Sequence, residues 1–117
     1  MEAKLSKVEI VTSLSKFTEL NGTLGKLGVT GMTVMQVLGC GVQKGAREYA
    51  KDMNVNMELL PKQLISIVVE TERVPKVIEA VKQTLYTGHI GDGKIFVSDI
   101  TNVVRVRTGE EGSEALK

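Results

Sequence analysis

Residues 62–86 read KQLISIVVETERVPKVIEAVKQTLY, and the hydrophobic period of this stretch changes part-way along it. Residues 62–70 alternate between two largely apolar faces, and this period of two predicts a strand. Residues 74–86 carry apolar side chains at spacings of three and four, which predicts a helix with one apolar face. Pro75 fits the first turn of that helix, because its missing N–H leaves no hydrogen bond unmade there. The stretch therefore predicts a strand followed by a helix, each with a side that must be buried.

The rest of the chain extends this pattern in both directions. Before the stretch, apolar periodicity predicts strands at residues 7–13 and 31–40, with a helix at 15–27 between them. After it, the pattern predicts a strand at 94–100 and a short fifth strand at 103–107. The order βαββαβ is typical of the ferredoxin-like α+β sandwich, in which two helices cover one face of an antiparallel sheet. Since the other face keeps Leu64 and Val68, we expect three copies to pack sheet to sheet as a homotrimer.

Length and composition limit the classes of protein. The chain has 117 residues, which fits a single domain, and its 3% aromatic content without Trp predicts an aliphatic core. A net charge of +1 argues against a nucleic-acid partner, which needs a broad basic surface. The lone cysteine, Cys40, permits no internal disulfide, and the N-terminus shows no apolar signal core, so we expect a cytoplasmic protein. Two segments depart from compact structure: a long loop at 42–60 and a polar tail at 109–117 that we predict to be mobile.

Two patterns point to an anion ligand, and each has a second interpretation. Residues 87–94 read TGHIGDGK, in which three glycines turn main-chain N–H groups outward and Lys94 adds a positive charge. The same residues also suit a tight helix-to-strand turn. Arg105 and Arg107 are two apart on the predicted fifth strand, so both guanidinium groups would lie on one face and suit a phosphate chain. They equally suit a solvated edge strand.

The ends of the long loop form a third pattern. Gly39 and Gly41 flank Cys40 and permit close approach of a ligand to the main chain, or else mark a bulge that ends the strand. Gln43 and Lys44 begin the loop and Lys62 follows it, so the loop either closes over a metal–anion complex or is simply hydrated. No catalytic triad, paired carboxylates or P-loop is present in the sequence. A binding protein is therefore favoured over the alternative of a nucleotide-using enzyme on this fold.

Taken together, these motifs resemble the PII family of nitrogen-signalling proteins. The resemblance covers nearly the whole chain with the spacing between motifs kept. Its motifs are the segments 28–34 (GVTGMTV), 39–45 (GCGVQKG), 60–62 (LPK), 87–97 (TGHIGDGKIFV) and 104–110 (VRVRTGE). The opening VEIVT at 8–12 and the Gly-Cys-Gly segment are similar to the Gram-positive branch.

The resemblance implies a homotrimeric regulator, not an enzyme, in which ATP and ADP compete for clefts between neighbouring subunits. It places adenine and ribose against Thr33, Gly39, Gly41 and Val68, with Val42 and Gln43 beside the nucleotide. It places the phosphates against Gly91, Asp92, Gly93, Lys94, Arg105 and Arg107. It also implies that 2-oxoglutarate binds through Mg²⁺ held by the ATP phosphates and Gln43, with Lys62 on the far carboxylate and the main chain of Lys44 and Gly45 completing the pocket.

The long loop departs from the family pattern. Val55 stands where many relatives carry a tyrosine that is nucleotidylated, and Val42 where many have an arginine near the phosphates. Since a hydrogen bond to a charged group contributes about 1.5–3 kcal/mol, nucleotide affinity or ATP/ADP discrimination should differ. The resemblance implies a loop that contacts the regulated partner, an ammonium channel, another membrane transporter or a metabolic enzyme. We expect these contacts at Ala46, Arg47, Glu48, Tyr49 and Val55. The alternative is a sensor of the ATP/ADP balance without a response to 2-oxoglutarate.

Overall fold

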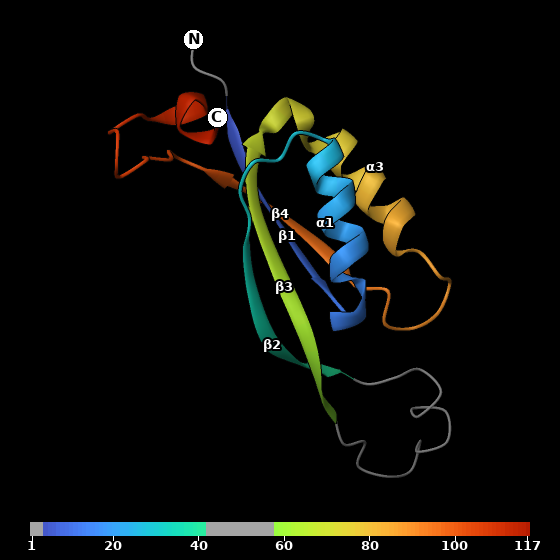
Figure 1. Ribbon diagram of the computed structural model, residues 1–117. Coiled ribbons are helices and arrows are strands. Elements are labelled where there is room, and N and C mark those ends of the chain that lie inside the picture. The colour runs from blue at the N-terminus through green and yellow to red at the C-terminus, as the bar shows by residue number, and fades with distance from the viewer. Residues whose placement is uncertain (1–3, 42–57) are drawn as a thin grey trace.

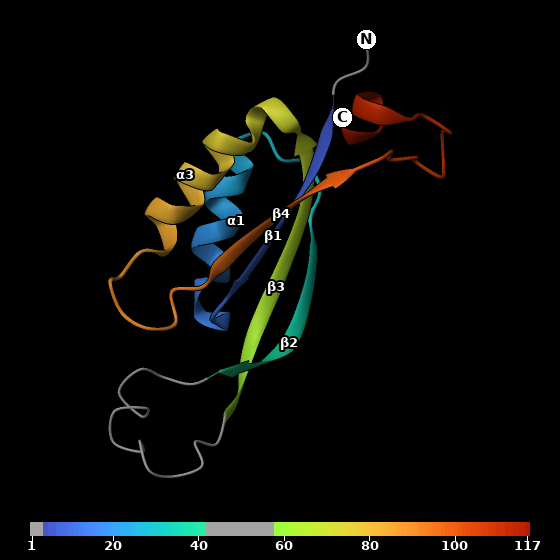
Figure 2. The ribbon, with the colours of Figure 1, turned by 180° about the vertical axis from the view of Figure 1, so that it is seen from behind.

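The protein is a four-stranded antiparallel sheet with two helices packed on one face. The computed structural model describes residues 4–41 and 58–117. The strands are β1 (Leu5–Thr12), β2 (Thr33–Gly41), β3 (Glu58–Glu70) and β4 (Lys94–Ile100), arranged in the order β2-β3-β1-β4. Helices α1 (Phe17–Lys26) and α3 (Val74–Leu85) lie side by side on the same side of the sheet (Figures 1 and 2). This architecture confirms the predicted ferredoxin-like α+β fold.

The core lies between the two helices and one face of the sheet. This is the face that the alternation of apolar side chains along the strands predicts to be buried. Ile10 of β1 is directly opposite Ile65 of β3 and Ile95 of β4, so the three side chains project toward the helices. The buried apolar side chains of the described residues are all Leu, Ile or Val, as the aromatic-poor composition predicts. Eleven of them form one cluster that joins the two layers, and the half-buried Phe17 packs against it. The cluster consists of Val8, Ile10, Leu20, Leu24, Ile65, Ile67, Val69, Val74, Val77, Val81 and Leu85.

The opposite face of the sheet, which we call the open face, carries no α-helix among the described residues. Met35 pairs with Leu64 across β2 and β3, and Phe96 pairs with Glu9 across β4 and β1. Met35 and Phe96 are 48% and 53% exposed. An apolar surface of this kind on a sheet is typical of a protein interaction site. Within the described residues, no helix has the length and apolar character needed to cross a membrane.

The predicted fifth strand at residues 103–107 is wrong. The structure instead closes residues 104–111 into a short hairpin, the arginine hairpin, held by one antiparallel bridge between Val104 and Glu111. Arg105 N donates to Glu110 O at 2.8 Å, and Gly109 N donates to Arg105 O at 2.8 Å. The valines that mimic strand alternation face no neighbouring strand, and Val106 is 97% exposed. The segment therefore bonds to itself.

The boundaries of the long loop and of the tail also differ from expectation. Residues 58–60, predicted as loop, belong to β3, which pairs with β2 as far as Gly41↔Glu58. Pro61 is tolerated in this strand because β1 pairs with β3 only as far as Gln63, so one side of β3 is an edge at Pro61. The tail forms a 3-10 helix, Gly112–Leu116, bonded to the body of the domain, and its predicted mobility stays a prediction.

Candidate functional site

The loop between α3 and β4, residues 87–93, is organised around one carboxylate. We call it the glycine loop. Asp92 accepts hydrogen bonds from Thr87 N at 2.8 Å and Gly88 N at 3.1 Å, and from the Thr87 hydroxyl. The Thr87 hydroxyl in turn accepts from His89 N at 3.2 Å. The Asp92 side chain is thus turned into its own loop, and any contact that this residue makes with an anion would use its main-chain N–H.

These bonds also act on the ionisation of Asp92. The hydrogen bond from the Thr87 side chain and then that from its main-chain N–H hold the pKa of the Asp92 carboxyl below its ordinary value of 3.8, because both favour the charged form. The carboxylate is therefore ionised at neutral pH. This negative charge lies in a loop that we expect to bind phosphate. The main-chain N–H groups of the loop must therefore face the phosphate while the carboxylate is turned away from it.

Close packing fixes the end of the glycine loop against β1. Gly93 has φ +114°, and a Cβ built on it would lie 3.1 Å from Thr12 Cβ and would overlap Val11 O. The Thr12 hydroxyl donates to Asp92 O at 3.0 Å. Only glycine fits this combination of positive φ and close main-chain approach.

Lys62 reaches the glycine loop from β3. A Cβ built on Gly91 would lie 3.9 Å from Lys62 Nζ, and one built on Gly39 would lie 2.9 Å from Lys62 Cγ. The Lys62 stem therefore crosses Gly39 and carries its ammonium group to Gly91. The structure brings together three glycines and two lysines from β2, β3, the glycine loop and β4, since Lys94 begins β4 directly after the loop. We call this cluster the loop half-site: Gly39, Lys62, Gly91, Gly93 and Lys94.

A groove of about 930 Å³ lies at the other end of the sheet. Its wall includes the connection 28–32 before β2, and its floor includes Thr33 and Val68, which the resemblance assigns to the nucleotide. Arg105 and the tail line its remaining side. We call this cluster the groove half-site: Thr33, Val68 and Arg105.

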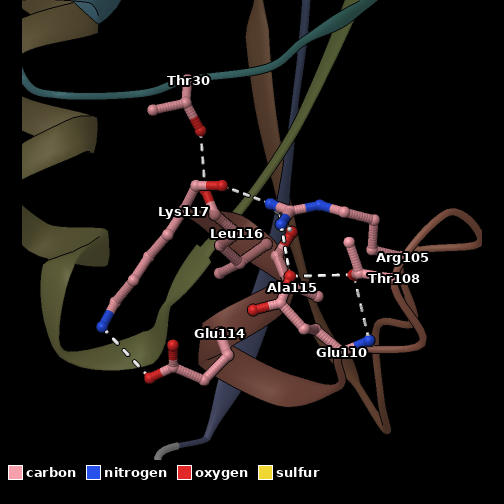
Figure 3. A network of polar contacts seen from close by, with 8 residues as sticks. All are labelled: Thr30, Arg105, Thr108, Glu110, Glu114, Ala115, Leu116 and Lys117. Carbon is pink, nitrogen blue, oxygen red and sulfur yellow. Dashed lines mark hydrogen bonds and ion pairs between the residues drawn. The ribbon is translucent and has the colours of Figure 1, made fainter.

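Arg105 is held by the tail and by its own hairpin (Figure 3). Its Nη1 forms an ion pair with Glu110 Oε1 at 2.6 Å, and its Nη2 donates to Ala115 O at 3.0 Å and to Lys117 O. The Thr30 hydroxyl donates to Leu116 O at 2.6 Å and joins the tail to the groove wall. The structure thus assigns Arg105 a set of intramolecular partners that the sequence did not reveal.

Arg107 lies in the turn of the arginine hairpin and is exposed. The two arginines therefore do not share a strand face as predicted, because Arg107 is part of the turn and Arg105 lies before it. The half-sites that should serve one nucleotide are also far apart within one chain. β4 runs from the glycine loop toward the arginine hairpin (Figures 1 and 2). It has seven residues, and at about 3.4 Å per residue its ends are about 20 Å apart.

The remaining predicted residues are at the end of β2 or outside the described residues. Gly41 ends β2. Outside the described residues lie Val42, Gln43, Lys44, Gly45, Ala46, Arg47, Glu48, Tyr49 and Val55.

Sequence reasoning missed two residues that shape the glycine loop. Thr12 continues the alternation of Val8 and Ile10, so its place on the buried face was readable from the sequence. Thr87 stands five residues before Asp92 in a glycine-rich turn, a setting in which a carboxylate often bonds to nearby N–H groups. Only the structure shows that both hydroxyls bond to the same residue.

The fold and these two clusters define a ferredoxin-like domain with separate lysine-rich and arginine-bearing half-sites suited to an anion. The family model described as "Nitrogen regulatory protein P-II" matches residues 5–110. The chain belongs to this family, the PII proteins.

Individual relatives are similar in sequence to this chain over almost its full length. The chain is 45% identical to "Nitrogen regulatory PII-like protein" of Bacillus subtilis (strain 168), over 99% of this chain and 100% of the relative. It is 43% identical to "Nitrogen regulatory protein P-II" of Pasteurella multocida (strain Pm70), over 96% and 100%. Among solved structures, the B. subtilis GlnK-ATP complex is 44% identical with a TM-score of 0.82, covering 97% of this chain and 98% of that one. Arabidopsis thaliana PII bound to citrate is 34% identical with a TM-score of 0.76, covering 97% and 92%.

Proposed function

We propose that the chain is a trimeric regulator that binds ATP and ADP in clefts between neighbouring copies. The observation that carries this proposal is the separation of the two half-sites. One triphosphate cannot contact both ends of β4 in the same chain, because the strand is about 20 Å long. A neighbouring copy that placed its groove half-site against the loop half-site of the first would give one ligand both the lysines and the arginines.

The open face supports the trimer. Met35, Leu64 and Phe96 make the side of the sheet opposite the helices apolar, and two of them are about half exposed in the single chain. Sheets that pack face to face bury such side chains. A ring of three copies covers all three open faces and brings the end of each sheet beside its neighbour. It thereby creates three clefts as well as a core.

ATP as the ligand is supported by the GlnK-ATP complex of B. subtilis, a structure of a relative with the same fold. In this chain, the main-chain N–H groups of Gly91 and Gly93 with the ammonium of Lys94 suit phosphate oxygens, and Thr33 and Val68 suit the adenosine end. Arg105 and Arg107 of a neighbouring copy would complete the phosphate site. Arg105 would then give up part of its bonding to the tail and to Glu110.

We further propose that 2-oxoglutarate joins Mg-ATP, and that the loop at 42–60 reports this state to a transporter or a metabolic enzyme in the cytoplasm. The position of the Lys62 ammonium beside Gly91 supports a second anion next to the phosphates, with Gln43, Lys44 and Gly45 as further ligands. The magnesium ion would supply the positive charge that lets two anions bind side by side. A relative, A. thaliana PII, was solved with citrate, a carboxylate ligand.

Calorimetric titration tests both levels of the proposal. ATP with Mg²⁺ is titrated into the protein in the presence and absence of 2-oxoglutarate, and the mass in solution is measured by light scattering. We expect a trimer that binds ATP and ADP, and 2-oxoglutarate binding only when Mg-ATP is present. A monomer without ATP binding would refute the regulator. ATP and ADP binding without 2-oxoglutarate would leave a sensor of the ATP/ADP balance, the alternative that Val42 favours.

A matched pair of lysine variants assigns the second anion. Lys62→Gln should abolish 2-oxoglutarate binding and leave ATP binding nearly intact, since only the far carboxylate loses its partner. Lys76→Gln, an exposed residue of α3, has the same change in charge and should alter neither. Equal 2-oxoglutarate binding by the wild type and Lys62→Gln would contradict the assignment.

A further inference from the structure

Thr12, at the end of β1, carries a buried hydroxyl group and is not among the residues proposed to contact a ligand. Thr12 is 1% exposed, and its hydroxyl donates to the main-chain oxygen of Asp92 at 3.0 Å, eighty residues along the chain. The strand end that carries it is itself fixed, because Gln63, 3% exposed, donates to Ser13 O at 2.8 Å. The glycine loop is thus attached to a rigid point of the sheet through one peptide oxygen.

That oxygen controls the direction of a neighbouring N–H group. The oxygen of Asp92 and the N–H of Gly93 belong to the same planar peptide unit, and the described residues contain no cis peptide bond. In a trans peptide these two groups point in opposite directions. Since the oxygen faces Thr12, the N–H of Gly93 points away from β1. Within the described part of the chain, the N–H groups of Gly91 and Gly93 donate to no acceptor.

The glycine at one end of this peptide makes its direction changeable. A rotation of the Asp92–Gly93 peptide changes ψ of Asp92 and φ of Gly93, and Gly93, with φ +114°, crosses between positive and negative φ without the steric cost that a Cβ imposes. A rotation of the Asp92–Gly93 peptide would replace the N–H by a carbonyl oxygen on the side away from β1. An oxygen there would repel a phosphate that the N–H would bind. One hydrogen bond from Thr12 opposes this rotation.

We propose that Thr12 is a positioning residue for phosphate binding, holding the Asp92–Gly93 peptide so that the Gly93 N–H faces the ligand. Thr12 does not touch the ligand. It acts through the peptide oxygen of Asp92, while the Asp92 carboxylate orders the opposite side of the loop through Thr87. The inference rests on the proposed function, because its ligand is the phosphate chain of a nucleotide.

The test distinguishes the effect of losing the hydroxyl group from the effect of losing side-chain volume. Thr12→Val removes the hydroxyl and keeps the branched shape, Thr12→Ala removes both, and Thr12→Ser keeps the hydroxyl. The control is Ser6→Ala, which removes a hydroxyl equally buried (1% exposed) at the other end of β1, bonded to Thr71 Oγ1 at 2.8 Å. Each variant is titrated with ATP and with adenosine, and its thermal unfolding is recorded.

The affinity for ATP should follow the hydroxyl. Thr12→Val and Thr12→Ala should weaken ATP binding about tenfold or more, the size expected for losing one hydrogen bond to a charged group. Thr12→Ser should bind ATP like the wild type. Adenosine has no phosphate, so its affinity should be the same for the wild type and for the three Thr12 variants. Ser6→Ala should lower the unfolding temperature without changing ATP affinity.

Two results would overturn the inference while leaving the proposed function in place. One is wild-type affinity for ATP in Thr12→Val or Thr12→Ala. The other is an equal loss of ATP and adenosine affinity, which would show general damage to the fold and not a phosphate effect. Wild-type protein that binds no ATP would overturn both the inference and the proposed function.

Discussion

Gly93→Ala adds a single methyl group at the most crowded of the glycines whose surroundings the structure describes. A Cβ at this position would lie 3.1 Å from Thr12 Cβ and would approach Val11 O far inside the 3.0 Å that real Cβ atoms keep. The residue also has φ +114°, which an L side chain rarely adopts. Strain at such a φ costs about 1–3 kcal/mol, and overpacking against the main chain of β1 costs about 1–3 kcal/mol more. The sum, about 2–6 kcal/mol, is a large part of the roughly 5–15 kcal/mol that stabilises a domain.

Thermal unfolding at one fixed protein concentration measures this cost. For a domain of this size about 1 kcal/mol corresponds to at least about 4 °C, so Gly93→Ala should unfold at least about 8 °C below the wild type. ATP affinity should fall as well, because the strand end and the glycine loop cannot both keep their positions.

Two other glycines provide matched controls. Gly91→Ala has a similar φ of +105°, but its Cβ would meet nothing closer than Lys62 Nζ at 3.9 Å, so only the backbone strain remains. Gly22→Ala in α1 has nothing within 4 Å and should stabilise the helix by up to about 1 kcal/mol. If Gly93→Ala proves no more destabilising than Gly91→Ala, the close approach to β1 contributes nothing and the reasoning is refuted.

Three further predictions concern charge, ligand and assembly. The pKa of Asp92 is lowered in the folded protein, so its stabilising contribution is present above the ordinary value of 3.8 and is lost as pH falls through the lower folded value. The stability gap between wild type and Asp92→Asn should therefore be wider at pH 7 than at pH 3, and a gap independent of pH in chemical denaturation would contradict this. Arg107→Ala should weaken ATP binding in calorimetry and leave the trimer and its unfolding temperature unchanged, since the side chain is exposed. Arg105→Ala should weaken ATP binding too, and it should also loosen the tail, which would show as faster amide exchange at 112–117. Unchanged ATP affinity in Arg107→Ala would remove that residue from the site. Phe96→Glu places a charge on the open face, so light scattering should show monomers with unaltered helical circular dichroism; an intact trimer would exclude this face as the interface.

Local patterns predicted the elements that bury one face against the core. Residues 62–86 change from a period of two to spacings of three and four, and the structure has β3 and α3 there because each period places one apolar face on the same core. The lack of Trp and the low aromatic content likewise predicted a core of Leu, Ile and Val. Such burial depends on the spacing of residues along the chain, which the sequence displays directly.

The arginine hairpin shows where a local pattern fails. Val104 and Val106 alternate with Arg105 and Arg107 as a strand would, yet no strand of the sheet lies beside them, and Val106 is almost fully exposed. A strand needs a partner, and the partner is set by the path of the whole chain. The ion pair of Arg105 with Glu110 and the fold of the tail follow from that path.

The sequence by itself determined the order of the strands β1 to β4 and the helices α1 and α3, the aliphatic core and, through its motifs, the family. The tertiary structure decided how the motif residues are grouped: it places Lys62 beside Gly91, and it places Arg105 and Val68 around one groove. It also decided the position of the Thr12 hydroxyl, which bonds to Asp92 O from eighty residues away. The physical reason is that a hydrogen bond or a close approach depends on which distant segments lie side by side in space. The spacing of residues along the chain does not determine which segments these are.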